Sequence, residues 1–113
     1  MTRYYILDGH EPIPTDNLLE WARWYATANR RVAFDQIANS EISTVFLGLS
    51  YRGGEGAPLL FETMVFVGPL DQEHNRYSTW DDAAEGHRQM VDRVRKNHLR
   101  HEATKLAAQE AQP

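Results

Sequence analysis

Residues 41–68 read EISTVFLGLSYRGGEGAPLLFETMVFVG, two apolar runs joined by a glycine-rich connector. In the first run, alternate residues from Val45 onward are aliphatic, whereas the side that carries Phe46 is mixed, so the pattern predicts a strand buried on its Val45 side. The second run, residues 59–67, is apolar on both sides, as expected of a strand that is central or covered on its second face. Because residues 52–58 include three glycines, which accept positive φ, the two runs should pair as an antiparallel hairpin.

The segments on either side of this hairpin alternate between strand and helix patterns. Residues 4–7 form a short apolar run, and residues 16–28 place an apolar stripe along a helix. Residues 32–36 alternate as a strand, and a capping-box-like pattern at Ser78 and Thr79 marks the start of a second helix. We therefore predict an α+β domain of order β-α-β-β-β-α, with a three- or four-stranded, mainly antiparallel sheet and both helices packed largely on one face.

Charge is distributed unevenly along the 113 residues, which are expected to form one domain over residues 1–97. Residues 1–87 hold six arginines and thirteen acidic residues, whereas residues 88–113 hold six basic and three acidic residues. The apolar pattern thins from Asn97 onward, so residues 98–113 are interpreted as a basic tail that is a frayed helix or disordered. The net charge of −4 argues against generic nucleic-acid binding, although the basic tail keeps it as a third hypothesis.

Several classes of protein are disfavoured by what the sequence lacks. It holds no cysteine, no run of membrane-spanning length and no signal-peptide pattern, so we expect a soluble protein of the cytoplasm. His98 and His101 have a spacing that can support a pair of metal ligands, but no HExxH or CxxC pattern accompanies them. A solvated basic helix explains them, and we expect neither a metal nor a cofactor.

Three residues are candidates for a ligand site. His87 lies in the middle of the apolar stripe of the second helix, so it is either hydrogen-bonded within the core or placed at a cleft. Glu62 interrupts an apolar side of the 59–67 strand and is either a salt-bridge or rim residue, or an acid with a chemical role. Arg52 adjoins the glycine-rich loop. Since no complete catalytic motif is present, the sequence favours a non-enzymatic function.

A second set of residues is predicted to form an interface. Trp24 lies off the centre of its helical stripe, and Phe46 lies on a sheet face that is too apolar to be left bare. Burial of that face against a second subunit predicts a homodimer or higher oligomer. Arg88 and Arg95 belong to the basic segment that a partner could contact.

The strings STVFLGL, PLLFETMVF and RYSTWDDAAEGHRQMV, with the opening YYILDGHEPIPTDNLLEWARW, resemble a group of small uncharacterised proteins of bacteriophages and prophages. The resemblance covers most of residues 4–95 and implies an accessory phage protein in the host bacterial cytoplasm, without implying a mechanism. The leading hypothesis is a binding protein that engages a host bacterial protein, such as a defence or regulatory factor. The alternative is a small-ligand or nucleotide-binding protein, a sponge or a hydrolase, with a pocket near His87 and residues 53–56.

Overall fold

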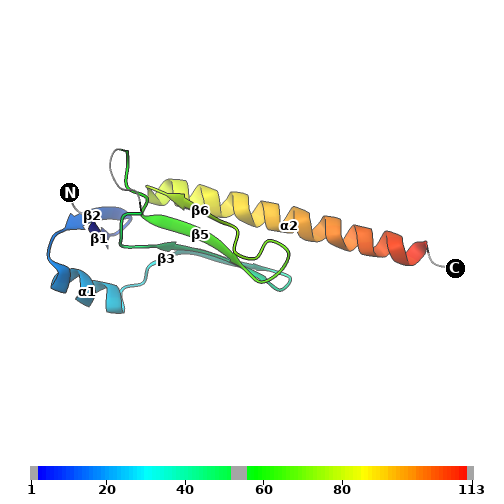
Figure 1. Cartoon of the computed structure of the whole chain (residues 1–113), viewed down its shortest axis with the longest axis horizontal. Helices are drawn as coiled ribbons and strands as arrows, with labels where there is room; N and C mark the ends of the chain where they lie inside the picture. The colour runs from blue at the N-terminus through cyan, green and yellow to red at the C-terminus, as the bar shows by residue number, and fades with distance from the viewer. Residues whose placement is uncertain (1–2, 52–55, 112–113) are drawn as a thin grey trace.

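The computed structural model describes residues 3–51 and 56–111, which form two antiparallel sheets and two helices (Figure 1). Strands β1 and β2 form a separate two-stranded sheet, and β3 to β6 form a four-stranded sheet in the order β3-β4-β5-β6. The elements are β1 (Tyr4–Asp8), β2 (Glu11–Thr15), α1 (Leu18–Thr27), β3 (Arg31–Ile37), β4 (Ser40–Phe46), β5 (Phe61–Phe66), β6 (His74–Tyr77) and α2 (Trp80–Glu110). The predicted α+β class with an antiparallel sheet is confirmed.

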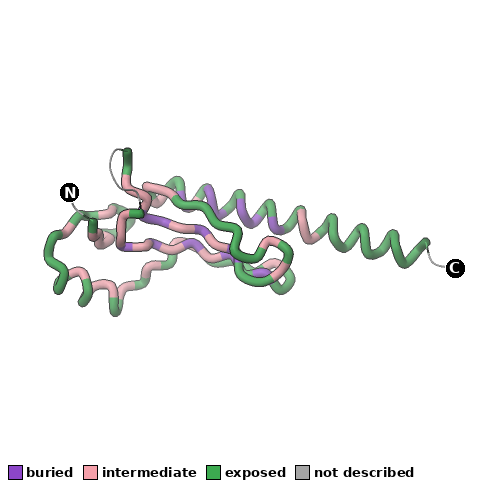
Figure 2. Tube along the Cα trace, viewed as in Figure 1, coloured by how far each residue is buried: buried purple, intermediate pink, exposed green. Residues whose placement is uncertain are grey.

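The central hairpin is present as β4 and β5, whose register pairs Ile42 with Val65 and Phe46 with Phe61. Helix α2 crosses one face of the sheet and contacts all four strands. The core lies between them in two clusters, one around Ile42 and Val65 and one around Phe46 and Phe61. Figure 2 shows this burial along the middle of the sheet and the first half of α2.

The prediction that β4 is buried on its Val45 side is wrong. The fully buried residues of β4 are Ile42, Thr44 and Phe46, and Val45 is only half-buried on the opposite face. Strand β5 follows the same register, so Phe61, Thr63 and Val65 point toward α2. The aliphatic positions after Phe46 misled the pattern, because β4 ends at Phe46 and those residues belong to the connection to β5.

The N-terminal hairpin and α1 cover the end of the sheet at which α2 begins (Figure 1). Helix α1 packs on β1 and starts at Leu18, two residues after the start of the predicted stripe, with Asn17 as its N-cap accepting a hydrogen bond from the Glu20 amide. Its Trp21 indole donates to the carbonyl of Gly48, 3.0 Å away, which joins α1 to the segment after β4. Strands β2 and β6 are additional to the predicted order β-α-β-β-β-α.

Helix α2 begins where its capping pattern predicts, since the Thr79 hydroxyl accepts a hydrogen bond from the Asp82 amide. Gly86 is buried against the ring of Tyr77 in β6, and a Cβ at this position would overlap that ring. The helix does not fray near Asn97 but continues to Glu110, so residues 98–110 project beyond the sheet as an exposed arm and the long axis of the molecule reaches 68 Å (Figure 2). Residues 98–110 are therefore a regular continuation of α2.

Neither helix of the described chain has the combination of length and apolar character that crossing a membrane requires.

Candidate functional site

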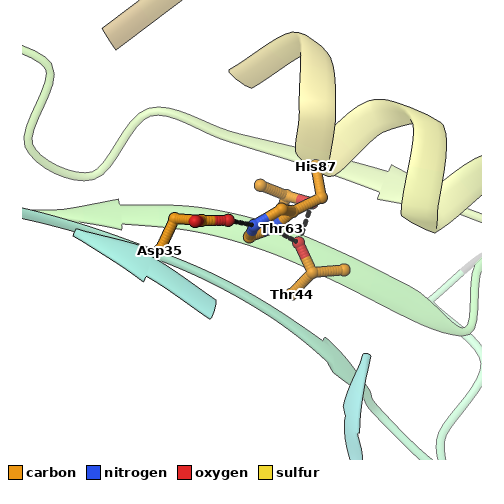
Figure 3. Close-up of polar contacts among 4 residues, drawn as sticks. All are labelled: Asp35, Thr44, Thr63 and His87. Atoms are coloured by element: carbon orange, nitrogen blue, oxygen red, sulfur yellow. Dashed lines mark hydrogen bonds and ion pairs between the residues drawn. The ribbon is translucent and has the colours of Figure 1, made fainter. Parts of the chain in front are cut away.

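His87 lies at the centre of a polar network inside the interface between α2 and the sheet (Figure 3). Its Nδ1 is 2.7 Å from Oγ1 of Thr44, and its Nε2 is 2.8 Å from Oδ2 of Asp35. The Thr44 hydroxyl also contacts the Thr63 hydroxyl at 2.5 Å. The network around His87 therefore joins residues of β3, β4, β5 and α2. Of the two predicted environments of His87, the structure shows the one in which it is hydrogen-bonded within the core.

The donors and acceptors of this network form one directed chain. A carboxylate only accepts, so the Asp35 oxygen fixes the proton on Nε2 of His87. With a neutral imidazole, Nδ1 then accepts from the Thr44 hydroxyl, which in turn accepts from Thr63. Every buried side-chain nitrogen and oxygen in the described chain has a partner, so the network is fully satisfied.

Hydroxyl, imidazole and carboxylate are arranged in the order used by hydrolases with a nucleophilic serine. Here the hydroxyl of that series belongs to Thr44, which has a solvent exposure of 0%, and His87 has one of 3%. Only Asp35, with 52% of its side chain exposed, reaches water. Because no substrate can approach Thr44 while α2 covers it, the network fixes the register of α2 on the sheet rather than performing acyl transfer.

Glu62 lies on the opposite face of β5 from this network. Its neighbour Thr63 points toward His87, and successive side chains of a strand point to opposite faces. Glu62 instead accepts a hydrogen bond at 2.9 Å from Nε of Arg76 in β6, which makes the salt-bridge reading the observed one. Arg52 lies outside the described residues. Glu62 points away from the side of the sheet that His87 contacts, so these two predicted residues are not brought together.

The predicted interface residues have different environments. Trp24 is half-buried and packs edge-on against Phe46, with ring centroids 5.8 Å apart. Phe46 is fully buried, so its side chain is not available to a partner. Arg88 is exposed and paired with Glu85 on α2, and Arg95 is exposed. The oligomer prediction relied on a bare face around Phe46, and that premise is wrong because α2 covers the face.

The face of the four-stranded sheet turned away from α2 carries apolar side chains that the sequence did not single out. Phe34 and Phe66 are 41% and 42% exposed, and Val45 and Met64 on the same face are half-buried. We call these four residues the open face. Ser43 and Glu41 of β4 separate the two rings. Charged groups flank the open face: the Arg31 guanidinium lies 4.7 Å from the centre of the Phe34 ring, and the Glu62–Arg76 ion pair lies beside Val45. The sequence pattern pointed to the opposite arrangement, because it predicted that the Val45 side of β4 is buried.

Among the residues that the structure describes, no cluster of three or more His, Cys, Asp or Glu side chains is arranged to hold a metal ion. A scan against protein-family models and searches of curated proteins and of solved structures found no match to this chain. The function is therefore argued from the two features above: a buried polar network that holds the fold together, and an open sheet face.

Proposed function

We propose that this chain is a non-catalytic binding protein that engages another protein through the open face. One observation carries the proposal: two phenylalanine rings, Phe34 and Phe66, are each about two-fifths exposed on a sheet face that α2 does not cover. Covering the remaining surface of one ring stabilises a complex by about 2 kcal/mol, at roughly 25 cal/mol per Å² of apolar area.

The composition of the open face suits a protein partner. Phenylalanine, methionine and arginine are among the residue types that are enriched where proteins bind one another. Arg31 lies over Phe34, and Arg76 lies over the ring of Tyr51 at 4.5 Å, so both guanidinium groups are positioned by aromatic contacts. Positioned side chains lose less conformational entropy when a partner binds.

The kind of partner is suggested by the sequence resemblance to small bacteriophage and prophage proteins. We propose a host bacterial protein, such as a defence or regulatory factor, as the partner, with the host cytoplasm as the place where the two meet. A second copy of this chain is the competing occupant of the open face, and the mass of the purified protein in solution, measured by light scattering, distinguishes the two.

The experiment is a quantitative pull-down from host lysate with three forms of the full chain: wild type, Phe66→Lys and the control Leu106→Lys. Phe66 pairs with Glu41 across the strands, so a lysine there gains an opposite charge and the sheet is expected to remain folded. Leu106 is 57% exposed on the arm, away from the open face.

We expect one host protein to be recovered with wild type and Leu106→Lys, and about tenfold less of it with Phe66→Lys, since about 1.4 kcal/mol corresponds to a factor of ten. The captured protein is then purified and its affinity for each form measured directly. Equal recovery by all three forms, or no reproducible recovery by wild type, would refute the proposal.

A further inference from the structure

A cavity lies at the end of the sheet from which the arm of α2 projects. It has a volume of about 420 Å³ and is enclosed by the β3–β4 turn, the β5–β6 connection and α2. Ile37, Leu70 and Val94 line its apolar part, and Ile37 and Leu70 pack against the cluster that contains Val94. This volume falls in the range of roughly 300–1,000 Å³ that is typical of small-ligand pockets.

The stripe of α2 that faces the sheet changes character at this cavity. His87, Met90 and Val94 are buried against the strands, whereas the same stripe continues as His98, His101 and Lys105 once the sheet ends. These last three side chains line the cavity together with Glu102. Within the described chain, none of these four side chains forms a hydrogen bond or an ion pair. The cavity is thus apolar toward the sheet and carries available donors toward the arm.

All charged groups of the cavity come from α2, because the two turns contribute only uncharged residues to its lining. Lys105 offsets Glu102, so the two imidazoles decide the balance of charge. Both imidazoles supply N–H donors. The arm side of the cavity is therefore suited to an anionic group.

We propose that this cavity binds a small amphipathic carboxylate, with the apolar chain against Ile37, Leu70 and Val94 and the carboxylate at Lys105 and the two histidines. The cavity lies at the end of the core on the α2 side of the sheet, so the inference is separate from the binding of a protein at the open face. A carboxylate that receives hydrogen bonds from a lysine or an imidazole makes the stronger, charge-assisted type of hydrogen bond.

The test measures binding to the full chain by NMR titration, observing the imidazole signals, with three probes that share an eight-carbon chain: octanoate, octylammonium and octanol. The variants are the double substitution His101→Gln/Lys105→Gln and the control Lys96→Gln. Lys96 belongs to the same helix but is ion-paired with Asp92 and lies outside the cavity. Both changes fall on exposed side chains, so folding is expected to be retained.

We expect octanoate to bind wild type about tenfold more tightly than octylammonium. The double variant should lose about tenfold in octanoate affinity, whereas Lys96→Gln should bind as wild type does; a tenfold change corresponds to about 1.4 kcal/mol. Equal affinity for octanoate and octylammonium, an equal loss in Lys96→Gln, or no binding of octanoate would each overturn the proposal.

Discussion

Thr44→Val removes the hydroxyl that connects the two ends of the buried network without changing the shape of the side chain much. In the wild type this hydroxyl donates to Nδ1 of His87 and accepts from the Thr63 hydroxyl. The variant leaves both of those groups buried without a partner. Each unsatisfied buried group costs about 1–3 kcal/mol, so the free energy of unfolding should fall by about 2–4 kcal/mol.

Adding a second substitution gives a sharper expectation. In Thr44→Val/Thr63→Val only Nδ1 of His87 lacks a partner, so the double variant should be more stable than Thr44→Val alone by about 1 kcal/mol or more. Thr63→Val alone leaves the bond between Thr44 and His87 in place and should be the mildest of the three. A double variant that is more stable than one of its single variants identifies coupled residues, because the stability changes of independent sites add.

The assay is urea unfolding at equilibrium, with the slope m required to stay constant across the series so that a changed midpoint reports stability. Thr104→Val is the control, since Thr104 is exposed and its hydroxyl bonds only to the carbonyl of Arg100 on the arm; it should stay within about 0.5 kcal/mol of wild type. The reasoning is refuted if Thr44→Val costs less than Thr104→Val, or if the double variant is less stable than Thr44→Val.

Three further predictions concern single positions. Gly86→Ala should lower stability by about 1–2 kcal/mol, because the overlap of a new Cβ with the Tyr77 ring outweighs the helical preference for alanine; a stabilised variant would contradict this. Gly68→Ala should cost more than Gly9→Ala in the same unfolding assay, since both have positive φ but only at Gly68 would a Cβ overlap the Ser40 hydroxyl; equal costs would show that the contact is irrelevant. Burial raises the pKa of the Tyr77 phenol above 10.0, with the Asn75 side chain opposing the shift, so the folded state holds this proton more tightly. The stability that this provides is present below pH 10 and is lost as the pH rises through the folded-state pKa. Tyr77→Phe should remove that part of the loss of stability when unfolding is measured at alkaline pH, and an unchanged dependence on pH would contradict this.

Local sequence patterns predict which segments of this chain are helices and strands. They do not predict which face of each strand is buried. Glycines in the connector and the alternation around them predict the β4–β5 hairpin, and the Thr79 cap predicts where α2 begins. Which side of β4 is buried depends on Thr44, a polar residue that is buried because its hydroxyl meets His87. Counting apolar residues on each side of β4 assigns the Thr44 side to solvent, so the predicted buried and exposed faces of the sheet are exchanged.

The same one-residue alternation explains why the predicted site did not assemble. Glu62 and Thr63 are neighbours in β5, so only one of them can point toward His87, and an inverted face selects the wrong one. Asp35 carried no signal in the sequence, because an acidic residue on an edge strand is an ordinary surface residue until the helix that contacts it is placed. The position of His87 in the middle of an apolar stripe was the one reliable indication of the network.

The end of α2 was missed for a different reason. An apolar stripe shows where a helix has something to pack against, and that stripe stops near Val94 because the sheet ends there. Eight of the thirteen residues 98–110 are alanine, leucine, glutamate or lysine, which favour helix without any packing, so the helix continues beyond its apolar stripe. The boundary inferred at Asn97 is the end of the packed part of α2.

Methyl NMR of the methionines tests the open face most directly, because Met64 lies on that face and Met90 is buried on the other side of the sheet under α2. The protein is labelled at the methionine methyl groups and titrated with the protein partner recovered in the pull-down. The account predicts that the Met64 signal shifts or broadens in proportion to the complex formed while the Met90 signal stays in place. A complex that forms with the Met64 signal unchanged would contradict it.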